Sequence, residues 1–129
     1  MIPSVCWFLL MNILFLIPGS DLPRGNSFLE QIHFDKIVHL GLFGILGFLL
    51  IIPMLQRNVR GAAFKNRVIL VVILGSLYGL AVEFMQHAFV SGRSYDLGDW
   101  AADTAGILLS VPATLFIFRK WHNQKLRKG

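Results

Sequence analysis

The sequence predicts an all-α integral membrane protein in which four transmembrane helices form one bundle. Three observations lead to this fold class. Hydrophobic residues make up 55% of the chain and charged residues only 15%, whereas soluble proteins carry about 25% charged residues. The apolar residues fall into four long segments, and the basic residues are separated from the acidic ones along the chain. The 129 residues are enough for one domain, expected to cover residues 1–129.

We expect membrane spans at about residues 2–20, 37–55, 68–90 and 99–118. The first segment contains no charge. Its start also lacks lysine and arginine, and no A-x-A site follows, so a retained helix is expected rather than a cleaved signal peptide. Cleavage would leave the other three spans in the same orientation. Cys6 lies in this segment and is expected to pack as a small apolar residue.

The other three segments each carry few polar groups. The second has His39 as its one titratable residue, the third is uncharged up to Val82, and the fourth is uncharged from Thr104 to Phe118. Alone or with its flank, each reaches the length a helix needs to cross about 30 Å of hydrocarbon. Alternation with a period of two residues is absent, which argues against a β-barrel.

Charge placement predicts the orientation. The link from Gln56 to Arg67 and the tail after Phe118 are basic and contain no acid, and all seven acidic residues lie elsewhere. The positive-inside rule therefore places this link, the tail and both termini in the cytoplasm, and the two acidic linkers outside. The basic tail is interpreted as a topological anchor, so nucleic acid is not an expected partner.

Several ionisable groups are expected at one depth. At 1.5 Å per residue, Glu83 and Asp103 lie about 24 Å from Arg67 and Arg119, and His39 lies about 27 Å from Arg57. Three spans thus bring costly groups to the outer half of the bilayer, where such residues persist when they pair or line a wet cavity. We expect a polar pocket that opens to the outer face.

Helical spacing predicts which groups share a face. Residues three or four positions apart are neighbours on a helix. This spacing joins Asp35 with His39, Glu83 with Gln86 and His87, and Asp99 with Asp103. One row of fourth residues also runs through Gly75, Gly79, Glu83 and His87, and its Gly-x-x-x-Gly part is typical of close helix packing in membranes.

Each polar residue also has a structural interpretation. Asp96 can cap the fourth helix, with Asp99 favoured in the first turn by the helix dipole. Arg93 can serve a turn or a lipid head group, His87 can lie at the interface, and His39 can be a hydrogen-bonded packing residue. Glu83 and Asp103 are the hardest to explain as structural, although they could form a polar clamp.

Three blocks of residues resemble the VanZ-like family of bacterial membrane proteins. They are "DKIVHLGLFGILGF" from Asp35, "GLAVEFMQHAFVSGRSYDLGDWAADTAG" from Gly79, and the loop "PGSDLP" from Pro18. The family pattern reads D-K-x-x-H, E-x-x-Q, G-R-x-x-D-x-x-D and N-T-x-G, and Asp103 stands where Asn is usual. The resemblance implies a four-helix protein of the bacterial inner membrane. The founding member is associated with resistance to teicoplanin, a lipoglycopeptide antibiotic.

The first functional hypothesis is an envelope protein whose outward pocket binds membrane lipids, a lipid-linked cell-wall precursor or a lipoglycopeptide, and so reduces antibiotic access. Arg93 and Lys36 would contact a phosphate or carboxylate, while Glu83, Gln86 and Asp103 would hydrogen-bond a polar head group. The full set of candidate ligand-binding residues is Asp35, Lys36, His39, Glu83, Gln86, Arg93, Asp96, Asp99 and Asp103.

Two alternatives remain. A membrane-embedded acid/base or metal-dependent hydrolase or transferase would use Glu83, Asp99, Asp103 and His39, yet no known catalytic signature occurs. No cofactor is expected, and the weak candidates for a metal site are His39, Glu83, His87 and Asp99. A proton-coupled transporter is disfavoured because the inner halves of the spans are apolar and offer no polar path.

Overall fold

Helices make up the regular secondary structure of the part of the chain that the computed structural model describes, residues 2–17, 34–90 and 93–126. They are α1 (Ile2–Phe15), α3 (Phe34–Gln56), α4 (Gly61–Phe89) and α5 (Leu97–Leu126). The all-α prediction is therefore confirmed. The loop "PGSDLP", two of the seven acidic residues and the Ser91–Gly92 part of the expected turn lie outside the described residues.

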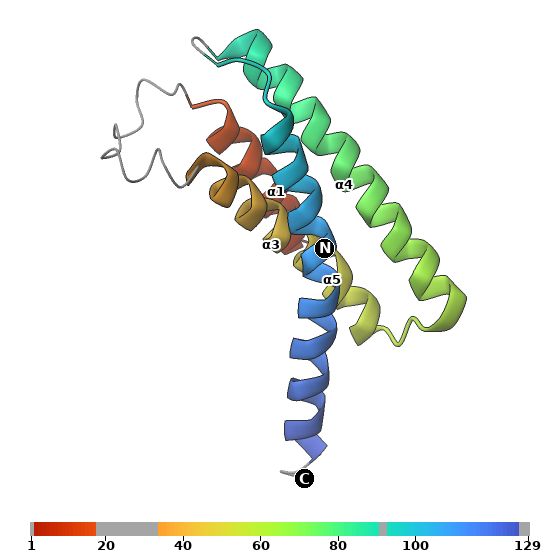
Figure 1. Cartoon of the computed structure of the whole chain (residues 1–129). Coiled ribbons are helices and arrows are strands. Elements are labelled where there is room, and N and C mark those ends of the chain that lie inside the picture. The colour runs from red at the N-terminus through yellow and green to blue at the C-terminus, as the bar shows by residue number, and fades with distance from the viewer. Residues whose placement is uncertain (1, 18–33, 91–92, 127–129) are drawn as a thin grey trace.

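Successive helices run in alternating directions (Figure 1). The α3–α4 loop and the C-terminal end of α5 lie at one end of the bundle, which we call the basic end, and the α4–α5 connection lies at the other, the acidic end. Helix α1 is antiparallel to α3, because the hydroxyl of Ser4 donates to the carbonyl of Leu49 and the indole of Trp7 donates to that of Leu42. This alternation places the basic loop and the basic tail at the same end of the bundle, as the charge pattern predicts.

Three of the described helices, α3, α4 and α5, are long and apolar enough to cross a membrane. The protein is accordingly a membrane protein. Large apolar side chains cover its outside, among them Leu77, Leu109 and Phe116, which are more than half exposed. Helix α1 has 14 residues, about 21 Å at 1.5 Å per residue, and is shorter than the span expected at 2–20.

The long helices extend beyond the predicted spans at the basic end. Helix α4 begins at Gly61 and so includes Lys65 and Arg67, and α5 continues past Arg119. Charge marks where hydrocarbon is expected to end, but backbone hydrogen bonds let a helix continue beyond that point. The reversal between α3 and α4 uses positive φ angles of 55° at Asn58 and 61° at Gly61, a conformation favoured by glycine and tolerated by asparagine.

Small residues allow α5 to pack closely against its neighbours. A Cβ atom built on Gly106 would lie 3.0 Å from the backbone nitrogen of Gly44, so α3 and α5 meet almost backbone to backbone. On the other side, Gly75 and Gly79 of α4 pack against Ile107 and Asp103 of α5. The glycines of the row predicted on α4 thus face α5, and the contact at Gly79 places α4 directly beside the buried Asp103.

Candidate functional site

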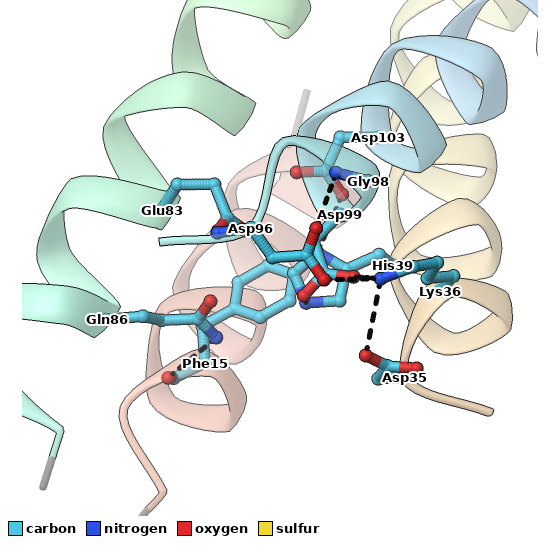
Figure 2. A network of polar contacts seen from close by, with 10 residues as sticks. All are labelled: Phe15, Asp35, Lys36, His39, Glu83, Gln86, Asp96, Gly98, Asp99 and Asp103. Carbon is cyan, nitrogen blue, oxygen red and sulfur yellow. Dashed lines mark hydrogen bonds and ion pairs between the residues drawn. The ribbon is translucent and has the colours of Figure 1, made fainter. Parts of the chain in front are cut away.

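A group of polar side chains from three helices lies at the acidic end of the bundle (Figure 2). We call it the acidic-end cluster. Its members come from the start of α3, the last turns of α4, and the first turns of α5 with the residue before them: Asp35, Lys36, His39, Glu83, Asp96, Asp99 and Asp103. Five carboxylates here share one ammonium and one imidazole, so negative charge and hydrogen-bond acceptors are in excess.

At the centre of the cluster is a buried pair between α3 and α5. Nδ1 of His39 lies 3.0 Å from Oδ1 of Asp103, and the two side chains are 2% and 0% exposed. The ring of Phe15 packs on the imidazole with centroids 4.7 Å apart and covers it from α1. Burial beneath an aromatic ring removes water from the pair, which strengthens the hydrogen bond and fixes the imidazole.

Lys36 is held by carboxylates from two segments. Its ammonium lies 2.6 Å from Asp96 Oδ2, 3.0 Å from Asp99 Oδ1 and 3.6 Å from Asp35 Oδ2. Asp99 is buried, whereas Asp35 and Asp96 are partly exposed. Because the ammonium already faces three carboxylates, it contributes charge balance to the cluster and offers little to a bound anion.

Asp96 caps helix α5 and links it to α4. Its Oδ1 accepts a 2.6 Å hydrogen bond from the backbone N–H of Gly98, which confirms the predicted N-cap. The backbone N–H of Asp96 donates to Oε2 of Glu83 at 3.0 Å. The cap residue of α5 thereby fixes Oε2 of Glu83, whereas Oε1 does not take part in this hydrogen bond.

Two carboxylate oxygens in the cluster are buried without a hydrogen-bond partner among the described residues. They are Oε1 of Glu83 and Oδ2 of Asp103, on side chains that are 2% and 0% exposed. Leaving a buried polar atom unpaired costs about 1–3 kcal/mol, and more when the group is charged. Such atoms in a folded protein call for a partner that completes them.

Three predicted site residues lie outside this cluster. His87 is exposed. Each step of four residues along a helix rotates the position by about 40°, and His87 is three such steps from Gly75, which faces α5. His87 therefore points about 120° away from the direction of Gly75. Gln86 is buried in its place, and its amide donates to the carbonyl of Phe15 at 3.2 Å, which ties α1 to α4. The partly exposed Arg93 precedes α5, and its side chain forms no ion pair within the described residues.

Two subsets of the cluster have the geometry of metal ligands. Donor atoms of His39, Glu83 and Asp103 all lie within 4.8 Å of one another, and the same holds for Asp35, Asp96 and Asp99. Imidazole with carboxylates suits several divalent transition metals. The first subset contains two of the four weak metal candidates from the sequence, His39 and Glu83, whereas Asp99 belongs to the second and the exposed His87 to neither.

Sequence reasoning missed two residues that shape the site. Phe15 covers His39, but a phenylalanine in an uninterrupted apolar helix carries no signal of that contact. Trp100 donates its indole N–H to the backbone oxygen of Ser76 at 3.1 Å and holds α5 against α4. A tryptophan next to Asp99 and three positions before Asp103 could have been recognised as a candidate support residue, since a buried indole requires an acceptor.

A family model described as VanZ/LLP1 matches residues 5–119 of the chain. This range includes every residue of the acidic-end cluster. No curated protein and no solved structure matches the chain significantly.

Proposed function

The chain belongs to the VanZ/LLP1 family, and on that premise we propose that it is a multi-pass protein of the bacterial cytoplasmic membrane whose acidic-end cluster binds the polar head of an amphiphilic envelope molecule. The cluster would face the outside, as the basic loop and tail favour the cytoplasm. Binding of a lipid-linked cell-wall precursor there would reduce the access of a glycopeptide antibiotic such as teicoplanin.

The unpartnered oxygens of Glu83 and Asp103 are the observation that carries this proposal. A head group that donates hydrogen bonds, through hydroxyl or amino groups, would complete both atoms and offset the excess of acceptors. Recognition of donors is therefore favoured over recognition of phosphate inside the cluster. Arg93 retains the role of phosphate contact at the rim, because Lys36 is engaged by carboxylates.

Photo-crosslinking tests this binding. A photoreactive residue at position 93 is expected to capture a labelled lipid-linked precursor, and unlabelled precursor should compete. A photoreactive residue at position 65, on the basic end, serves as the control. Glu83→Gln should lower capture at position 93 while expression and helicity persist. Equal capture at both positions, or capture that Glu83→Gln leaves unchanged, would contradict the proposal.

A second candidate function is a membrane-embedded hydrolase or transferase acting on a lipid-linked envelope substrate. The buried His39–Asp103 pair beside Glu83 favours it, since their donor atoms lie within 4.8 Å of one another. In this function Asp103 would orient the imidazole, and Glu83 would hold or transfer a proton. Product release from a labelled precursor, abolished by His39→Ala and retained in His87→Ala, would support catalysis. Binding without product formation would favour the first function.

A further inference from the structure

An apolar cleft of about 560 Å³ lies in the half of the bundle nearer the basic end, away from the acidic-end cluster. It is bordered by the first turns of α1, the last turns of α3 and the first half of α4, with Phe8, Leu46, Leu50, Met54, Leu70 and Leu74 among its walls. In Figure 1, α4 diverges here from the other helices toward the basic end. The volume falls in the range of about 300–1,000 Å³ that is typical of ligand sites.

Aromatic rings separate this apolar cleft from the acidic-end cluster. The ring centroid of Tyr78 lies 4.8 Å from that of Phe8 and 5.4 Å from that of Phe43, so Tyr78 packs against both rings. Tyr78 lines the cleft at the end nearer Glu83, whereas Arg67 lines it on the same helix at the opposite end. A ligand in the cleft therefore belongs to the basic end and is distinct from one bound at the acidic-end cluster.

Positive charge marks the basic end of the cleft. Arg57 and Arg67 both line it, and the sequence between them contains no acid. Neither arginine forms an ion pair within the described residues. Arg60, in the same loop, differs because it donates to the side chain of Asn58 at 3.3 Å and does not line the cleft. Two arginines that have no acidic partner in the described part of the chain form a site suited to a phosphate group.

We infer that the cleft binds an acyl chain of an anionic phospholipid, whose phosphate contacts Arg57 and Arg67. The apolar wall on α4 extends about 12 Å from Leu70 to Tyr78, long enough for much of a chain lying along the helix. Water in this cleft would hydrate apolar surface, which is unfavourable, whereas an acyl chain would remove that surface from water. Basic residues also gather where anionic lipids concentrate, at the cytoplasmic surface of a membrane. The apolar walls and the two arginines at one end of the cleft together match a molecule that has an apolar chain and a negatively charged head group.

Native mass spectrometry of the full chain, purified in detergent and delipidated, tests this inference. Phosphatidylglycerol, phosphatidylcholine with the same acyl chains, and inorganic phosphate alone would be titrated separately. We expect phosphatidylglycerol to bind best and inorganic phosphate not to be retained. The double variant Arg57→Gln/Arg67→Gln should weaken phosphatidylglycerol binding by about tenfold to thirtyfold. The matched control Arg60→Gln/Lys65→Gln removes the same charge from the same segment outside the cleft, and should bind almost as the natural protein does.

A second pair of variants tests the cleft itself. Leu74→Trp adds bulk to the cleft wall and should lower binding of both phospholipids. Leu77→Trp adds the same bulk to α4 on an exposed site outside the cleft and should not. Retained inorganic phosphate would indicate a simple anion site, and equal binding of the two phospholipids would remove the role of the arginines. A dimer whose formation is lost in Leu74→Trp would indicate that a second copy fills the cleft. Each of these three results would overturn the inference.

Discussion

Replacing Gly106 with alanine is expected to separate α3 from α5 and to disturb the His39–Asp103 pair. A Cβ atom at this position would lie 3.0 Å from the backbone nitrogen of Gly44 and 3.1 Å from the carbonyl carbon of Leu40, and still closer to that carbonyl oxygen. All three atoms belong to the backbone of α3 and cannot rotate away as a side chain would. The helices must therefore move apart, and Asp103 lies within one turn of the change.

The expected magnitude is a balance of two opposing effects. Overpacking costs about 1–3 kcal/mol in well-packed interiors, and contact with a rigid backbone places Gly106 toward the upper end. Alanine gains about 0.5–1 kcal/mol over glycine in a helix interior. We expect Gly106→Ala to lower the free energy of unfolding by about 1–2 kcal/mol. Gly41→Ala is the control, because a Cβ there meets no atom within 4 Å, and it should be neutral or stabilising.

Unfolding by sodium dodecyl sulfate in mixed micelles, followed by circular dichroism, measures both variants. Capture of labelled precursor at position 93 provides a functional measurement, and it should fall in Gly106→Ala and persist in Gly41→Ala. Equal stability of the two variants would refute the reasoning, since it would mean that α3 and α5 are not in backbone contact at Gly106.

Three further substitutions test the acidic-end cluster by the same unfolding measurement. Lys36→Met should destabilise the protein by about 1–3 kcal/mol, because the buried Asp99 carboxylate loses the ammonium that lies 3.0 Å away and keeps only the more distant imidazole of His39, at 3.9 Å; unchanged stability would show that Asp99 does not depend on Lys36. Trp100→Phe should cost about 1 kcal/mol through the lost indole hydrogen bond, and a neutral result would remove its proposed support of α5. His39→Ala should destabilise the bundle by about 2 kcal/mol or more, since it removes a buried ring and the partner of a buried carboxylate. His87→Ala, at an exposed site, should change stability by less than about 0.5 kcal/mol, and equal losses in the two histidine variants would contradict the arrangement of α4.

The convergence of ionisable groups could be predicted because a helix has a fixed rise. Counting residues from the basic flanks put His39, Glu83 and Asp103 at similar heights, and the structure brings these three buried side chains within reach of one another. The cap at Asp96 was also predictable, since it depends on neighbours in the chain. Both predictions use distances along one helix or one turn.

Partners could not be assigned in the same way. Helical spacing shows which groups share a face of one helix but not which group on another helix each of them meets. The structure places Lys36 against Asp96 and Asp99, and His39 against Asp103. These choices depend on how far apart two helices lie and how each is rotated about its axis. Neither quantity follows from periodicity on a single helix.

The sequence by itself determined the membrane class, the segregation of charge between the two ends of the bundle, and the similar height of His39, Glu83 and Asp103 along their helices. Tertiary structure alone decided that Phe15 covers His39, that Lys36 lies against Asp96 and Asp99, and that α4 diverges to leave a cleft beside Arg57 and Arg67. The physical reason is that composition and helical rise are properties of one segment of the chain and can be read from it alone. Rotation, separation and tilt between helices arise from packing among side chains distant in the sequence.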